Sequence, residues 1–208
     1  RPNGSAELTD FHLEMIEAGF VHGIEVANGD TYSEESFAIA LEHDLTIIGT
    51  SDIHNLIDWD YEPHAGGHRP VTLVFAEERS EAGIKAALEA RRTVAWYRNL
   101  LIGREAHLVP LLEASILVSG ARYLPRTQLL ELSLTNVSDA RFLLENESEW
   151  TLTGSGDLFE LPPHSTIRIE LRTGDALTRF ELPLSVENAL VEPGEEASIV
   201  LSGLVAQD

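Results

Sequence analysis

The sequence predicts an α/β part followed by an all-β part within a chain of 208 residues. In the first half, helical patterns alternate with short apolar runs, and such runs are typical of strands that are covered on both faces. Near residue 115 the apolar pattern changes to a period of two, which is typical of antiparallel strands with one buried face. We therefore expect one domain over residues 1–114 and a β-sandwich domain over residues 115–208.

The elements of the first half follow from apolar spacing and from the residues that begin and end each run. Leu8, Phe11 and Met15 lie at helical spacing, and Gly19 follows them as a helix end. In chain order we expect a helix over 6–18, a strand over 23–27, a helix over 34–44, a strand over 45–49, a long loop over 55–69, a strand over 71–75, a helix over 80–91, a strand over 93–97 and a helix over 103–113. This alternating order favours a parallel sheet or a barrel.

The second half reads as short alternating strands separated by turns. Leucine, isoleucine and phenylalanine alternate with polar residues in three segments, over 130–134, 167–171 and 180–182. Turn signals recur between them, such as Thr173-Gly174-Asp175 and Pro193-Gly194. Strands and turns at this spacing predict an immunoglobulin-like antiparallel β-sandwich.

The charge of the chain limits the partners that it can bind. Fourteen basic residues stand against 35 acidic ones, which gives a net charge of −21. This surface argues against a nucleic-acid duplex bound through a basic patch and against an anionic membrane surface. The acidic surplus fits ordinary solvation, adaptation to salt or heat, or an acidic face for cations or basic partners. A small phosphorylated substrate stays compatible with it, because a metal ion can reverse the local sign.

Other features of the composition exclude certain kinds of site. The chain has no cysteine, which removes disulfides and thiolate metal sites. No run approaches the roughly 18 to 20 apolar residues that span a bilayer. The first residues, from Arg1 to Ser5, do not form a signal peptide, and we expect the native N-terminus to lie further upstream. The sequence therefore indicates no compartment.

The sharpest local feature is Ser51-Asp52-Ile53-His54, which directly follows a predicted buried strand. Active sites of α/β folds gather at the carboxyl ends of such strands. In extended backbone, Asp52 and His54 would project to the same side. A carboxylate and an imidazole suit zinc, manganese or iron, although a catalytic site needs three or more ligands. The alternative is a loop aspartate that caps a turn beside an exposed histidine.

Four further residues are candidates at the edges of the predicted strands. Glu25 lies within the first strand and could be a metal ligand, an orienting group or a member of a structural ion pair. Asn28 follows the same strand, where turn formation is its alternative role. His68 and Arg69 precede the strand over 71–75; an arginine there could bind phosphate, or the segment could be a solvated loop.

Several runs together resemble the later part of a PHP domain, the polymerase and histidinol phosphatase superfamily of metal-dependent phosphoesterases. The resemblance covers about residues 20–117, and the Ser51–His54 stretch in its strand context is its most specific part. The runs that carry it are Gly23-Ile24-Glu25-Val26-Ala27-Asn28-Gly29, Ile48-Gly49-Thr50-Ser51-Asp52-Ile53-His54, His68-Arg69-Pro70-Val71-Thr72-Leu73-Val74-Phe75, Ala90-Arg91-Arg92-Thr93-Val94-Ala95-Trp96-Tyr97 and Leu101-Ile102-Gly103.

The resemblance implies the C-terminal portion of a (β/α)7 barrel, in which metal-bound hydroxide attacks a phosphoester. On this basis Asp52 and His54 would be metal ligands, Arg69 or His68 would bind the substrate phosphate, and Glu25 and Asn28 would support the site. The family's early His-x-His motif is absent from this sequence. The resemblance thus implies a fragment of a phosphoesterase with little catalysis of its own, whose barrel a missing N-terminal segment or another chain completes. The alternative is a non-catalytic binding module built on a remnant of such a domain.

Overall fold

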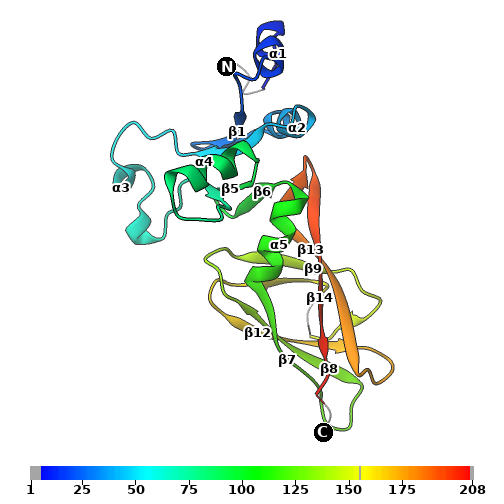
Figure 1. Cartoon of the computed structure of the whole chain (residues 1–208). Coiled ribbons are helices and arrows are strands. Elements are labelled where there is room, and N and C mark those ends of the chain that lie inside the picture. Colours follow the sequence, from blue (N-terminus) through cyan, green and yellow to red (C-terminus); the bar gives the residue numbers. More distant parts are fainter. Residues whose placement is uncertain (1–5, 155, 207–208) are drawn as a thin grey trace. The chain divides into compact units, whose positions relative to one another are not determined.

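A computed structural model of the chain describes residues 6–154 and 156–206. The chain divides into two compact units. The first unit comprises Arg1–Leu108 with Ala189–Glu195, and the second comprises Val109–Asn188 with Glu196–Asp208. Most of the first unit is drawn in blue to green in Figure 1. Among the described residues, no helix is both long and apolar enough to cross a membrane.

Serine side chains begin two helices of the first unit. Ser33 accepts a hydrogen bond of 3.1 Å from the backbone of Ser36, and Ser80 accepts one of 3.0 Å from Gly83, as N-terminal caps do. The elements of this unit are α1 (Asp10–Glu17), β1 (Gly23–Asn28), β2 (Thr31–Tyr32), α2 (Glu34–Glu42), β3 (Thr46–Thr50), α3 (Ile57–Asp60), the 3-10 helix η1 (Pro63–Ala65), β4 (Val71–Val74), α4 (Glu81–Glu89), β5 (Thr93–Tyr97), β6 (Leu100–Gly103) and the start of α5 (Glu105–Ser115).

The strands of the first unit form two hydrogen-bonded groups. In one, β1 lies between β3, to which it is parallel, and the two-residue β2, to which it is antiparallel. In the other, β4, β5 and β6 are successive antiparallel neighbours. The long strand β13 (Arg179–Glu192) returns to this unit, where Ala189 and Leu190 pair in parallel with Leu101 and Ile102 of β6.

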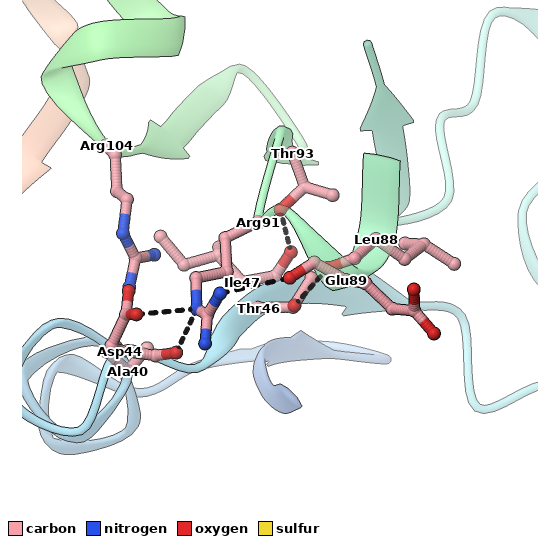
Figure 2. Close-up of polar contacts among 9 residues, drawn as sticks. All are labelled: Ala40, Asp44, Thr46, Ile47, Leu88, Glu89, Arg91, Thr93 and Arg104. Carbon is pink, nitrogen blue, oxygen red and sulfur yellow. Dashed lines mark hydrogen bonds and ion pairs between the residues drawn. The ribbon is translucent and has the colours of Figure 1, made fainter. Parts of the chain in front are cut away.

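Threonine side chains join β3 to the second group of strands. The Thr93 hydroxyl donates to the Ile47 carbonyl over 2.8 Å, as Figure 2 shows. The Thr72 hydroxyl donates to the carbonyl of Gly49 and accepts from its N–H, both at 2.9 Å. A Cβ atom on Gly49 would lie only 2.9 Å from the carbonyl oxygen of Val71, so glycine permits this close approach. Thr93 contacts Ile47, and Ala95 lies next to Gly49, so β3 and β5 run in the same direction. Their carboxyl ends therefore lie at the same edge of the first unit.

The core of the first unit lies between α2 and the strands. It consists of fully or nearly fully buried apolar side chains that pack into one cluster. Its members are Val26, Phe37, Ala40, Leu45, Ile47, Ala95, Ile102 and Leu190. Because these residues come from α2, from Leu45 just before β3, and from β1, β3, β5, β6 and β13, burial of this cluster fixes the strands that lead to the candidate site.

The predicted fold class, with the C-terminal portion of a (β/α)7 barrel, is wrong. Over residues 6–154 and 156–206 the strands do not close into a barrel, and strand structure predominates over helix. The parallel pairs in the first unit are β1 with β3 and β6 with β13, whereas β4, β5 and β6 are antiparallel. The alternating order of helices and strands had suggested parallel pairing throughout, but α4 connects two antiparallel strands.

The second unit is built from strands with alternating burial. In β8, Leu130, Leu132 and Leu134 are fully buried, and the residues between them are not. One sheet has the strand order β10-β12-β8-β7. In a second sheet, β9 lies between β11 and β13. The strands are β7 (Ile116–Tyr123), β8 (Leu129–Asn136), β9 (Phe142–Asn146), β10 (Thr151–Leu152), β11 (Leu158–Leu161), β12 (Thr166–Arg172), β13 and β14 (Glu195–Leu204). The alternation predicted for the second half is present in these strands.

Candidate functional site

A polar cavity of about 420 Å³ lies in the first unit, where β1 and β3 end. Most of the residues that line it are polar, and three of them are the aspartates Asp30, Asp52 and Asp60. The lining residues are Asn28, Gly29, Asp30, Thr31, Ser51, Asp52, Ile53, Asp60 and Tyr61. A cavity at the carboxyl ends of neighbouring parallel strands is where α/β proteins place their ligands.

Asp52 contributes to the wall of this cavity through an unusual backbone conformation. Strand β3 ends at Thr50, and Asp52 has a φ of +48°, in the left-handed region. Because the chain is not extended at Asp52, the expected projection of Asp52 and His54 to one side does not follow from strand geometry. His54 is exposed and is not among the lining residues. Binding of one metal ion by both residues remains a prediction.

Glu25 joins the ends of β1 and β3 beside the cavity. One carboxylate oxygen accepts a hydrogen bond of 2.7 Å from the Asn28 amide, and the other accepts one of 2.8 Å from the Thr50 hydroxyl. The backbone N–H of Gly29 donates to the Thr50 carbonyl over 3.0 Å. In this arrangement Glu25 orients Asn28, which itself lines the cavity. Of the roles open to Glu25, these contacts favour that of an orienting group.

Two tyrosines complete the site. Sequence reasoning missed Tyr61, whereas Tyr97 ends the predicted strand over 93–97, at an edge equivalent to that of the candidate residues. The Tyr61 hydroxyl donates to the carbonyl of Ser51 over 2.8 Å, next to the left-handed Asp52. The Tyr97 hydroxyl donates to the carbonyl of Asp30. Burial raises the pKa of the Tyr61 hydroxyl, and the carboxylates of the cavity wall raise it further. Tyr61 therefore stays protonated near neutral pH and keeps its role as a donor.

Sequence reasoning also missed two of the three lining aspartates. Asp30 follows the β1 run after Asn28 and Gly29, a position that could have been recognised as another strand end. Asp60 gave no such signal. It ends α3, within a segment that was expected to be a continuous loop, and only the folded path of that loop brings it to the cavity.

His68 and Arg69 do not line the cavity. The His68 ring packs on Trp96 of β5, with ring centroids 4.0 Å apart and planes inclined by 41°. Arg69 is exposed one residue further along, before the buried Pro70. Their role in binding a substrate phosphate remains a prediction.

The residues of this chain meet only part of the requirement of a metal centre. Among residues 6–154 and 156–206, no three or more histidine, aspartate or glutamate side chains converge in a way that could hold a metal ion. Asp52 offers one carboxylate in a cavity whose other donors are carboxylates, an amide and hydroxyls. A catalytic zinc site needs three protein ligands, so the described residues do not form a complete one.

Comparison with known proteins finds similarity for both parts of the chain. A family model described as an Ig-like domain matches residues 116–202. A crystal structure of a two-domain protein from Bacteroides vulgatus, described as containing a predicted PHP-like metal-dependent phosphoesterase, is 35% identical to this chain with a TM-score of 0.86. No curated protein matches the chain.

The match to the crystal structure extends over 97% of this chain and 58% of the other, so the chain spans little more than half the length of that protein. The fold described above is therefore similar to part of a two-domain PHP-like protein, and its second half is similar to Ig-like domains.

Proposed function

We propose that this chain is part of a metal-dependent phosphoesterase that hydrolyses a small phosphorylated substrate. The observation that carries the proposal is the 35% identity over nearly the whole chain to a protein described as containing a predicted PHP-like metal-dependent phosphoesterase. The acidic cavity at the ends of β1 and β3 supports it, because carboxylates at this position suit divalent cations. On this proposal, residues 1–114 belong to the phosphoesterase and residues 115–208 form an accessory domain.

Within this function, Asp52 and His54 would be two of the ligands of zinc, manganese or iron. The remaining ligands would come from outside the described residues, since these form no group of three donors. The contacts of Glu25 with Asn28 and Thr50, and of Tyr61 with Ser51, would hold the wall in place around Asp52. Arg69 or His68 would bind the substrate phosphate.

The open edge of β1 supports the involvement of a further polypeptide segment. Gly23, Ile24 and Glu25 pair on one side with β3, whereas on the other side the described part of the chain offers only β2, which pairs with Ala27 and Asn28. Unpaired strand edges tend to be covered. We propose that residues outside this sequence, or another chain, cover this edge.

A non-catalytic binding module is the second candidate, and the incomplete ligand set among the described residues favours it. The two functions differ in their response to metal removal. We expect the full-length natural protein to release phosphate from small phosphoesters, to lose this activity after treatment with a chelator, and to regain it with zinc, manganese or iron. Bound ligand without turnover, in the presence of each of these metals, would support the binding module instead.

A further inference from the structure

Asn28 and Gly29 form an Asn-Gly dipeptide in the wall of the cavity. Asparagine deamidates most readily before glycine, because glycine has no Cβ that would keep its backbone nitrogen away from the asparagine side chain. Asn28 ends β1, and Gly29 has a φ of +55°, in the left-handed region that glycine adopts without strain. Both residues are only partly buried, so water reaches this turn. The wall therefore contains the groups of a spontaneous modification.

Deamidation of this dipeptide proceeds through a cyclic imide. The backbone nitrogen of Gly29 gives its proton to a base of the solvent, and its electron pair forms a bond to the side-chain carbon Cγ of Asn28. The bond from Cγ to the side-chain nitrogen breaks, and ammonia leaves after it takes a proton from the solvent. Water then opens the ring at one or the other carbonyl carbon, which gives an aspartate or an isoaspartate. The sequence of steps involves no oxidation or reduction.

Hydrogen bonds hold each group that has to move in this reaction. The side-chain amide of Asn28 donates to Glu25 over 2.7 Å. The peptide unit between Asn28 and Gly29 is held at both ends, since its N–H donates to the Thr50 carbonyl over 3.0 Å and its carbonyl accepts from the Thr31 hydroxyl over 2.9 Å. Attack on Cγ requires this peptide unit to rotate and its nitrogen to approach in an aligned geometry. The folded wall therefore opposes the reaction.

We propose that Asn28-Gly29 is a deamidation site that hydrogen bonds to Glu25 and Thr50 keep unmodified in the folded protein. Deamidation then requires local opening of the turn after β1, and its rate follows the population of the open form. The contact between Glu25 and Asn28 thus has a second role, because it protects the chemical identity of a residue in the cavity wall. This role is independent of the proposed hydrolysis.

Conversion of the Asn28 amide would change the wall permanently. A carboxylate at this position has no N–H group to donate to Glu25, and the two negative charges would repel each other across a former contact of 2.7 Å. Three aspartates already line the cavity, so a further carboxylate adds to the like charge. An isoaspartate would also lengthen the backbone by one carbon atom at the end of β1. We expect either product to loosen the link between β1 and β3.

Peptide mapping by mass spectrometry measures deamidation at Asn28 directly. The full-length protein would be incubated at mildly alkaline pH, once folded and once unfolded in urea. We expect Asn28 to react at least about 10-fold more slowly in the folded protein, since the turn must first open against its hydrogen bonds. Asn3-Gly4, an Asn-Gly dipeptide that lies outside the described residues, is the internal reference in urea. There it should react at a rate similar to that of Asn28.

Two variants test the hydrogen bonds themselves. In folded Glu25→Ala, which has lost the acceptor of the Asn28 amide, we expect deamidation of Asn28 to accelerate about 5- to 30-fold. Glu42→Ala is the matched control, because it removes the same charge from an exposed position of α2 and should leave the rate unchanged. Thr50→Val removes only the hydroxyl that donates to Glu25 and should accelerate the reaction by a smaller factor.

The outcomes that would overturn this inference are equal rates at Asn28 in the folded and the unfolded protein, or equal rates in folded Glu25→Ala and Glu42→Ala. Circular dichroism establishes whether each variant is folded. Should Glu25→Ala not fold, the comparison of Thr50→Val with Glu42→Ala decides, and equal rates in these two variants would likewise overturn the inference.

Discussion

The hydroxyl of Thr50 donates a hydrogen bond of 2.8 Å to the carboxylate of Glu25, and this contact ties the end of β3 to the end of β1. The other oxygen of Glu25 holds the Asn28 amide at 2.7 Å. Both contacts are near the surface, so their main consequence is local order beside the cavity.

Replacing Glu25 with alanine removes the acceptor of both hydrogen bonds. We expect the free energy of unfolding to fall by about 1 to 2 kcal/mol, and amide hydrogen exchange at Asn28 and Gly29 to accelerate. Urea denaturation and hydrogen-exchange mass spectrometry measure these two effects. Glu25→Gln keeps one acceptor oxygen, so its free energy of unfolding and its rate of amide exchange should lie between those of the unaltered protein and Glu25→Ala. Equal amide exchange in all three proteins would contradict the orienting role of Glu25.

The buried hydroxyl of Thr93 supports β3 from the side of β5. It donates to the Ile47 carbonyl, and Thr93 is fully buried. Thr93→Val preserves the shape but removes the donor, so we expect a loss of about 1 to 2 kcal/mol in the free energy of unfolding. Thr151→Val, at an exposed position of β10, is the control and should change it little. Equal stability of the two variants would mean that this bond contributes nothing.

Asp44 holds two arginines at the other end of β3, as Figure 2 shows. Its carboxylate lies 2.9 Å from Arg91 and 3.3 Å from Arg104, and the side chain of Arg104 is only 18% exposed. Asp44→Ala leaves the largely buried side chain of Arg104 without this partner, so we expect the free energy of unfolding, measured by urea denaturation, to fall by about 1 to 2 kcal/mol. Glu42→Ala, an exposed change nearby, should cost less. Similar losses in both variants would argue against the ion pairs as the cause.

His107 gives the first unit a dependence on pH. Burial lowers the pKa of its imidazole below 6.5, and the charges of Arg104 and Arg92 lower it further. Because the unfolded chain then binds a proton more readily, the contribution of His107 is full above pH 6.5 and declines as the pH falls below that value. Denaturation at pH 5 and pH 7.5 should show a smaller loss of stability in His107→Gln than in the unaltered protein. The same loss of stability between pH 7.5 and pH 5 in both proteins would contradict the role of His107 in this pH dependence.

The local elements of the first unit could be predicted well where apolar runs are bounded by caps or turns. The strand Thr93–Tyr97 was predicted with its observed limits, and α4 lies within its predicted range. The direction of pairing could not be predicted in this way, because it depends on which apolar faces meet in the core. The side-chain bonds of Thr72 and Thr93, which join β3 to its neighbours, have no signal in the apolar pattern.

The candidate site could be predicted only where it follows a strand in sequence. Asp52 was found because it comes after β3, and Asn28 because it ends β1. The left-handed conformation of Asp52 and the return of Tyr61 to Ser51 depend on the folded path of residues 55–69, and an amino-acid pattern does not encode that path.

The most direct test of the proposed function is hydrolysis by the full-length protein with Asp52→Ala, compared with Asp58→Ala. Asp58 is an exposed aspartate of the same loop region and does not line the cavity. We expect kcat/KM for a phosphomonoester to fall by about 100-fold or more in Asp52→Ala, since even groups that only orient a metal ligand contribute 10- to 100-fold. Asp58→Ala should retain the activity of the unaltered protein. Unchanged hydrolysis by Asp52→Ala would contradict the account.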